Sequence, residues 1–363
     1  MFRKFKAFLD LGRVSKALKA ICDLGRVSNL PTVWTNCLAA WVLAGAGFSR
    51  SESMSLSGLE WILGKLTHLF TLPMLVIPAA AASLLYVGGT ALNDAFDAEY
   101  DREHRPERPI PSGALSLLSV WILGLGALLV GAGIFLHMGV TTGDVMLSAL
   151  AIGLVALILI YDWMHKKSVW AVLPMGGCRL LLYLVVAAAA VQVRYVFAVE
   201  AQTFEEIAAN GAASVALTTQ QLVSVIAVGA SLFVYMVVLT LSARAESGTE
   251  ELKVSGKVAL LLYLPAVVCI ALVVWHQAAE PQILATLVAG TLFVVWTKSA
   301  ITVLQSKVRD QSRIGIAVGR LLAGICLIDA MAAAAASTSI VPMLVCVGFF
   351  VLVLWLQRYV RST

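Results

Sequence analysis

The sequence is dominated by ten apolar runs, most of them about 20 residues long, that follow one another from residue 30 to the C-terminal end. A helix of about 20 apolar residues is long enough to cross the hydrocarbon core of a bilayer. In lipid, a helix also bonds all of its backbone N–H and C=O groups internally. The sequence therefore predicts an all-α fold, a polytopic transmembrane helical bundle of nine or ten helices. The runs cover approximately residues 30–48, 69–92, 114–138, 144–161, 170–193, 221–243, 258–276, 282–303, 315–335 and 340–357.

The composition excludes other classes of protein. Hydrophobic residues make up 60% of the 363 residues and charged residues only 13%, whereas soluble domains contain about 25% charged residues. A soluble fold of this composition would expose large apolar patches. A soluble domain, a secreted disulfide scaffold and a disordered chain are thereby excluded.

The positive charges predict an orientation in the membrane. Placing the N-terminus inside puts 20 of the 26 Lys and Arg residues in cytoplasmic segments and 3 in outside loops, with the remaining three inside spans. Because cytoplasmic loops of membrane proteins are enriched in Lys and Arg, we expect both termini to be cytoplasmic. The net charge of +5 has the same origin, and no nucleic-acid partner is predicted.

Two regions of different character are expected. Residues 1–29 are basic, with Phe2, Phe5 and Leu9 interleaved among the bases, a pattern that suits an amphipathic helix lying on an anionic leaflet. Residues 30–363 are expected to form a single transmembrane helical domain.

An acidic cluster at the end of the second run is the main candidate for chemistry. If the helix continues past Asn93, then Asn93, Asp97 and Asp101 lie on one face at i, i+4 and i+8, with Asp94 beside them. Like charges at this spacing repel, and carboxylates at a helix C-terminus oppose its dipole. A bound cation reverses both effects, and an all-oxygen ligand set suits Mg²⁺. The alternative is a solvated helix end that marks the membrane boundary.

The residues after the cluster form a basic, Pro-rich turn that could place Arg108 toward an anion held by such a metal. Together, the motifs resemble those of the UbiA superfamily of membrane prenyltransferases, whose usual helix count is nine. The matching stretches are Asn93-Asp94-x-x-Asp97-x-x-x-Asp101 with Arg108-Pro109-x-Pro111-Ser112-Gly113, the opening Arg26-x-x-Asn29-x-Pro31-Thr32, and Tyr161-Asp162-x-x-x-Lys166-Lys167.

The resemblance implies a transferase that moves a prenyl group from a prenyl diphosphate to an aromatic or other small acceptor with Mg²⁺. It also implies a bacterial inner-membrane protein whose active site opens to the cytoplasm. Its partners would be the prenyl diphosphate, the small acceptor and the lipid bilayer. By the same resemblance, the metal ligands are Asn93, Asp94, Asp97 and Asp101, of which the three aspartates are the catalytic residues, and Arg108, Lys166 and Lys167 bind the diphosphate. For Lys166 and Lys167, simple anchoring at the inner membrane surface is the alternative.

The sequence departs from the family pattern at the inner end of the sixth run. A second Asp-rich motif is expected there, but Thr240–Gly248 contains no aspartate. Arg244 could replace the charge of a second metal on the diphosphate, and Glu246 could hold the acceptor or a metal-bound water. The Ser242-x-Arg244-x-Glu246 variant resembles the EboC-like branch of the superfamily. The alternatives are a non-catalytic UbiA-like lipid or prenyl binder or carrier, and a secondary transporter.

Two further charges are predicted inside the membrane. Arg179 lies about nine residues into the fifth run, and an arginine at that depth usually faces the bundle interior and a partner. It is a candidate for binding the diphosphate or the acids of the second run, with snorkelling to the surface as the alternative. Asp329 lies midway along the ninth run and could be neutral, paired with Arg320 or part of an acceptor pocket.

Overall fold

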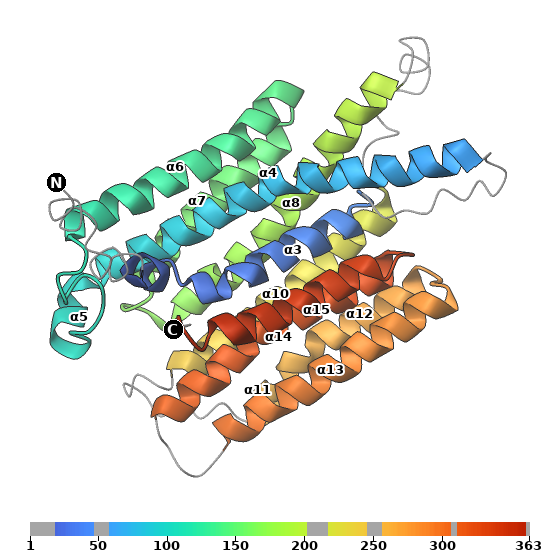
Figure 1. The fold of residues 1–363 in the computed structure, drawn as a ribbon. Coiled ribbons are helices and arrows are strands. Elements are labelled where there is room, and N and C mark those ends of the chain that lie inside the picture. Colours follow the sequence, from blue (N-terminus) through green and yellow to red (C-terminus); the bar gives the residue numbers. More distant parts are fainter. Residues whose placement is uncertain (1–18, 47–57, 202–216, 245–255, 306–310, 361–363) are drawn as a thin grey trace, which may run out of the picture.

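The computed structural model describes residues 19–46, 58–201, 217–244, 256–305 and 311–360. These residues form helices that run side by side in alternating directions, and α5 lies beyond the bundle at one end (Figure 1). The helices are α3 (Leu30–Leu43), α4 (Gly58–Phe96), α5 (Ala98–His104), α6 (Leu117–Thr142), α7 (Val145–Met164), α8 (Val172–Ala201), α10 (Thr219–Arg244), α11 (Gly256–Ala259), α12 (Leu264–Trp275), α13 (Glu280–Leu304), α14 (Gln311–Ala336) and α15 (Val341–Leu356), with short 3-10 segments η1 (Val27–Asn29), η2 (Val169–Ala171) and η4 (Leu260–Tyr263).

Each of the ten predicted runs coincides with a helical segment, so the all-α membrane bundle is confirmed. Eight helices of the described chain are long and apolar enough to cross a membrane. The remaining two runs form the shorter helices α3, with 14 residues, and α15, with 16 residues. Helix α3 ends before the predicted residue 48, because Gly45 follows it with φ +73°, a left-handed conformation that stops a helix.

The burial of the helices shows which of them are central. In the most apolar 18-residue stretch of α14, 72% of the residues are buried, whereas only 22% are buried in the corresponding stretches of α6 and α7. Helix α3 is buried along nearly all of its length. The centre of the bundle is therefore built on α3 and α14, while α6 and α7 present apolar side chains outward, as a lipid-facing helix does.

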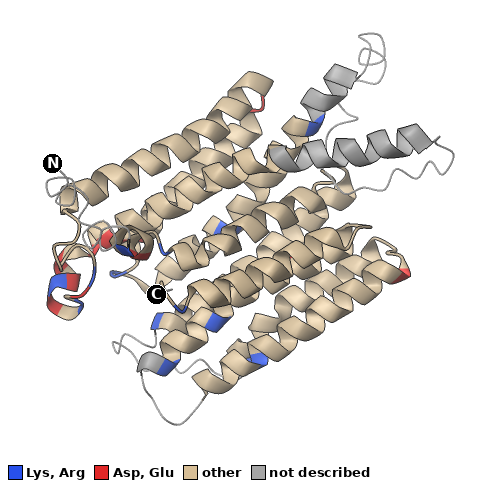
Figure 2. Cartoon of the chain, viewed as in Figure 1, with Lys and Arg blue, Asp and Glu red and all other residues tan. Residues whose placement is uncertain are grey.

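The charged residues gather at one end of the bundle. Figure 2 shows most of the described Lys and Arg residues at the end where α5 lies. The first 18 residues of the predicted amphipathic segment 1–29 lie outside the described residues, and residues 19–24 are helical.

Helices α4 and α6 approach closely through glycines. A Cβ added at Gly131 would lie 2.8 Å from the carbonyl oxygen of Ala81 and 3.0 Å from Leu85 Cγ, whereas a Cβ at Gly126 on the same helix would meet nothing within 4 Å. Small residues at such crossings let the helices pack by van der Waals contact, which is a main source of association in lipid.

This crossing gives a test of the packing. Gly131→Ala is expected to destabilise the protein by about 1–3 kcal/mol, because backbone must move to admit the methyl group. Gly126→Ala is the matched control on the same helix and is expected to be neutral or slightly stabilising, since Ala is the better helix former. Thermal unfolding of both variants in the same detergent measures the difference. Equal stability of the two variants would show that the crossing is loose.

Candidate active site

The acidic residues at the end of α4 form a continuous face, as predicted. The backbone N–H of Asp97 donates to Asn93 O at 3.0 Å, and that of Asp101 donates to Asp97 O at 2.8 Å. The helical bonding pattern therefore crosses the joint between α4 and α5, and keeps Asn93, Asp97 and Asp101 in register. These side chains and that of Asp94 are buried, with between 1% and 6% of each residue exposed. They do not form a solvated helix end.

Two arginines neutralise part of this face. Arg108, on the Pro-rich turn, donates to Asp101 Oδ2 at 2.8 Å and to Asp94 Oδ1 at 3.3 Å. Arg26, just before η1, donates to Asn93 Oδ1 at 3.1 Å and lies 3.4 Å from Asp94 Oδ1. The Pro-rich turn thus brings Arg108 to the acidic face, where it pairs with the carboxylates themselves, and its predicted contact with an anion stays a prediction. The sequence motifs included Arg26 but did not single it out.

Asp97 faces the end of α7. The Nε2 atom of His165 lies 3.0 Å from the Asp97 carboxylate, and Lys166 Nζ lies 3.4 Å from it. Burial by itself raises the pKa of Asp97, but the hydrogen bond and charge of His165, followed by those of Lys166, outweigh it and lower the pKa. Asp101 behaves in the opposite way, because burial raises its pKa further than Arg108 lowers it.

A fourth carboxylate, Asp162 on α7, lies beside the acidic face. Asn93 Nδ2 donates to Asp162 Oδ1 at 3.3 Å. Asp162 Oδ2 and Asp101 Oδ1 are buried and have no hydrogen-bond partner among the described residues. Sequence reasoning quoted Asp162 within a motif but did not select it as a site residue; an aspartate near the end of an apolar run was the signal that could have found it.

Of the remaining predicted basic residues, Arg244 and Lys166 lie at the acidic cluster and Lys167 does not. Arg244 donates to the carbonyl oxygen of His165, so the end of α10 reaches the same cluster. Lys166 also lies 3.7 Å over the ring of Tyr100, whereas Lys167 lies 4.6 Å over that of Trp163. Lys167 does not line the cavity described below. Glu246 lies outside the described residues.

Asn93 and Asp97 of the acidic face line a cavity of about 360 Å³, whereas Asp94 and Asp101 of the same face do not line it. Its polar wall lies at the charged end of the bundle and includes Arg26, Asn93, Asp97, Arg105, Arg108, Asp162, His165, Lys166 and Arg244. Further along, the wall is mainly apolar, with Val33, Leu85, Leu154, Ile158, Met175, Leu182, Met236, Leu239, Val318 and Leu322. One cavity therefore offers a charged mouth and an apolar interior.

Arg179 reaches this cavity from α8 and is only 8% exposed. It donates to the Oδ1 atom of Asn36 at 2.5 Å and to Thr32 Oγ1 at 3.0 Å. The amide of Asn36 in turn donates to Asp329 at 2.8 and 3.0 Å, and Tyr183 OH donates to Asp329 as well. Asp329 is therefore connected to Arg179 through Asn36. No direct pairing with Arg320 is present among the described residues.

A bundle of apolar helices that encloses a cavity with a charged mouth and an apolar interior defines an integral membrane protein with an amphipathic cavity. A profile of the UbiA prenyltransferase family matches residues 56–314. Since this match covers well over half of the 363 residues, the chain belongs to the UbiA prenyltransferase family.

Named relatives match shorter stretches. The digeranylgeranylglyceryl phosphate synthase of Methanopyrus kandleri is 37% identical over 110 residues, which cover 30% of this chain and 37% of the relative. The enzyme of that name from Pyrococcus abyssi is 33% identical over 120 residues, or 32% of this chain and 42% of the relative. The matches thus span less than half the length of these relatives. The EboC-like branch stays a prediction.

A solved structure from work on digeranylgeranylglyceryl phosphate synthase in membranes aligns over 88% of this chain and 98% of its own, with 14% identity and a TM-score of 0.49.

Proposed function

We propose that this protein is a membrane-embedded prenyltransferase, which moves a prenyl group from a prenyl diphosphate to a small acceptor. The observation that carries the proposal is the cavity, whose charged mouth suits a diphosphate and whose apolar interior suits an isoprenoid chain. The residues from the sequence that we propose for the metal and diphosphate site are Asn93, Asp94, Asp97, Asp101, Arg108, Lys166, Arg244 and Glu246, to which Arg26, Asp162 and His165 are added. Arg179, predicted with them, lies further along the cavity wall. Lys167 is better explained as an anchor at the membrane surface.

The basic side chains at the mouth supply the catalytic electrostatics. Breaking the bond between the allylic carbon and the diphosphate oxygen leaves negative charge on the diphosphate. Lys166, Arg108 and Arg244 stabilise this charge as it develops, and fixed charges in a water-poor site are effective at doing so. The apolar wall holds the chain and excludes water, so that the acceptor, rather than water, attacks the allylic carbon and loses its proton.

The residues present fit Mg²⁺. The donors are carboxylate and amide oxygens, and Asp101 Oδ1 and Asp162 Oδ2 are buried without partners. Among the described residues no three His, Cys, Asp or Glu side chains gather around one point, but Mg²⁺ usually takes one or two carboxylates together with substrate phosphates. Asn93, Asp94, Asp97 and Asp101 would hold the metal. When bound, it would neutralise charge on the leaving diphosphate.

The acceptor and the cellular location are narrower proposals. The name of the relatives points to a glyceryl phosphate acceptor, so a phosphorylated polyol belongs beside aromatic acceptors among the candidates. The distribution of Lys and Arg supports a cytoplasmic mouth, and a bacterial inner membrane is proposed from the resemblance to the EboC-like branch. Residues 30–363 would act as one membrane domain, with residues 1–29 on the membrane surface.

Release of diphosphate tests the proposal. Purified protein in lipid, given Mg²⁺ with a panel of prenyl diphosphates and of aromatic and polyol acceptors, is expected to release diphosphate. EDTA is expected to abolish the release and added Mg²⁺ to restore it, because the leaving group then loses its main charge compensation. Asp94→Ala is expected to lose the release as well. Release that survives both EDTA and Asp94→Ala would contradict the proposal.

A non-catalytic prenyl binder or carrier is the second candidate, and the lack of aspartate in Thr240–Gly248 is the observation that favours it. Tight, Mg²⁺-dependent binding of a prenyl diphosphate without turnover across the whole panel would identify it. A topology tag that places Asp97 on the outer side would contradict both candidates.

A further inference from the structure

Arg179 is a buried cation without a carboxylate partner. Only 8% of the residue is exposed, and no Asp or Glu oxygen of the described residues lies within 4 Å of its guanidinium, unlike those of Arg26 and Arg108 at the mouth. Its hydrogen bonds within the described residues go to neutral acceptors: Thr32 O, Thr32 Oγ1 and Asn36 Oδ1. They use three of the five N–H donors of a guanidinium.

The position of Arg179 directs it to the cavity. Met175, Cys178, Arg179 and Leu182 all line the cavity, and this i, i+3, i+4, i+7 spacing is one face of a helix. Arg179 lies seven residues after the start of α8 at Val172, which is about 10 Å along the helix axis at 1.5 Å per residue. The cation therefore belongs to the inner, mainly apolar part of the wall.

The contacts behind Arg179 orient it. Asn36 accepts from Arg179 through its carbonyl oxygen and donates to Asp329 through its amide. Asp329 is fully buried and also accepts from Tyr183. Asn36 thus lies between Asp329 and the guanidinium of Arg179. Asp329 supports the hydrogen-bond network without pairing directly with the cation.

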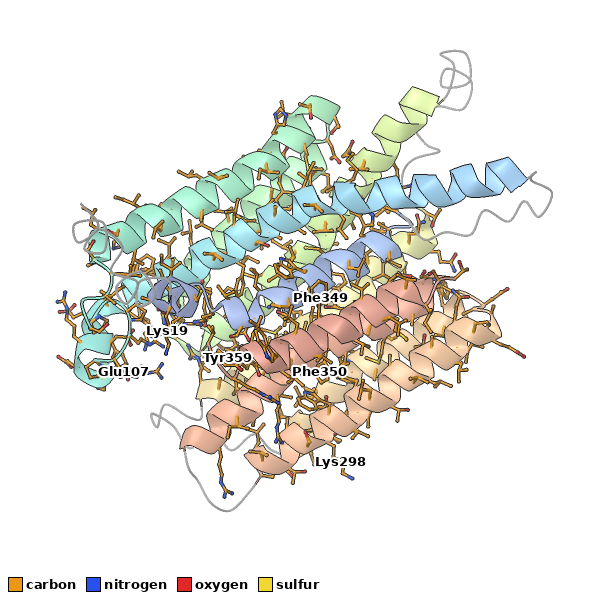
Figure 3. The ribbon with its side chains drawn as sticks, viewed as in Figure 1. Lys19, Glu107, Lys298, Phe349, Phe350 and Tyr359 are labelled. Atoms are coloured by element: carbon orange, nitrogen blue, oxygen red, sulfur yellow. The ribbon has the colours of Figure 1, made fainter. Side chains whose placement is uncertain are left out.

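Other charges inside the spans do not share this arrangement. Lys298 on α13 is exposed and points away from the bundle (Figure 3). Arg320 on α14 donates to the carbonyl oxygen of Ser299 and does not line the cavity. A cation in low dielectric attracts an anion far more strongly than one in water, and Arg179 is the cation that the inner wall presents.

We propose that Arg179 binds an acidic group of the acceptor, a carboxylate or a phosphate, in the inner part of the cavity. This inference rests on the proposed transferase function and gives the acceptor its chemical class: a small anionic molecule with a second, nucleophilic group. Arg179 is then a specificity residue, separate from the diphosphate site at the mouth.

Binding of matched probes tests the proposal. The protein in lipid nanodiscs is first saturated with Mg²⁺ and inorganic diphosphate, which occupy the mouth. Benzoate is then compared with benzamide, and glycerol phosphate with glycerol, by calorimetric titration. One acid is expected to bind at least tenfold more tightly than its neutral counterpart, as a charge-assisted hydrogen bond allows. The pair that responds identifies the acidic group.

Variants assign this preference to one residue. Arg179→Gln is expected to lose the preference and Arg179→Lys to keep part of it, while inorganic diphosphate binds both as it binds the wild type. Arg320→Gln is the matched control and is expected to keep the full preference. If Arg179→Gln does not fold, Arg179→Lys and the comparison of acid with neutral probe in the wild type still decide the matter.

Three results would overturn the inference: equal binding of acid and neutral probes by the wild type, an unchanged preference in Arg179→Gln, or an equal loss of diphosphate binding in that variant. The last would place Arg179 in the diphosphate site. Turnover without an acid preference would contradict this inference alone, and an acid preference without turnover would contradict only the transferase.

Discussion

Asp97→Asn is expected to reduce diphosphate release by about a hundredfold or more, the scale seen when one charged contact to a transition state is removed. The substitution keeps the volume of the side chain and removes its charge. Asp97 is buried and paired with His165 and Lys166, so losing the carboxylate disturbs both the proposed metal site and the lysine that faces the diphosphate. The loss is expected mainly in kcat, because the interaction acts on the departing group.

Glu99→Gln is the matched control for this substitution. Glu99 lies two residues further on, in the first turn of α5, and is exposed. Its neutralisation is expected to leave the rate within about twofold, since a solvated charge is screened. Steady-state release of diphosphate by both variants, at saturating prenyl diphosphate and Mg²⁺, measures the contrast. Similar rates for Asp97→Asn and Glu99→Gln would remove Asp97 from the site.

Asp329→Ala is expected to cost about 3 kcal/mol of stability, the largest effect that we expect on the fold. Asp329 is fully buried, and the substitution leaves the amide of Asn36 and the hydroxyl of Tyr183 without an acceptor. Each unsatisfied polar group in a buried position costs about 1–3 kcal/mol. Asp329→Asn retains one oxygen acceptor and is expected to lose less.

Asp144→Ala provides the comparison for Asp329. Asp144 caps α7 by accepting from Leu147 N at 3.0 Å, and loss of a cap costs about 1 kcal/mol. Thermal unfolding in one detergent ranks the variants, with Asp329→Ala expected to unfold at the lowest temperature. If Asp329→Ala were as stable as the wild type, the network behind Arg179 would have no structural role.

The sequence predicted local features well. The ten helical segments follow from the length of the apolar runs, and the acidic face follows from the spacing of Asn93, Asp97 and Asp101. Both depend only on neighbours along one helix. The proximity of Arg108 to the acidic face also follows from sequence, because it lies seven residues from Asp101 on a stiff turn, but its direct pairing with Asp94 and Asp101 was not predicted.

Contacts between distant segments were not predictable in the same way. His165 and Asp162 meet the acidic face from positions about 70 residues away, and Asn36 meets Asp329 across 293 residues. Such pairs depend on how the helices pack, which the apolar pattern of a single sequence does not specify. The pairing considered for Asp329, with Arg320, was chosen from proximity in sequence, whereas the fold supplies Asn36 and Tyr183.

Arg108 bonds Asp94 on α4 and Asp101 on α5 at the same time. This double contact affects how ligands enter the site. A lone anion that draws Arg108 away leaves Asp101 without its cation and Asp94 with Arg26 alone. A lone cation that takes those carboxylates leaves Arg108 without its partners. Either exchange leaves charge uncompensated in a site where that is costly. When a cation and an anion arrive together as one nearly neutral unit, the cation pairs with the two carboxylates and the anion pairs with Arg108. No charge is then left without a partner. The charged mouth therefore favours the entry of a metal–diphosphate complex over the entry of the metal or the diphosphate alone.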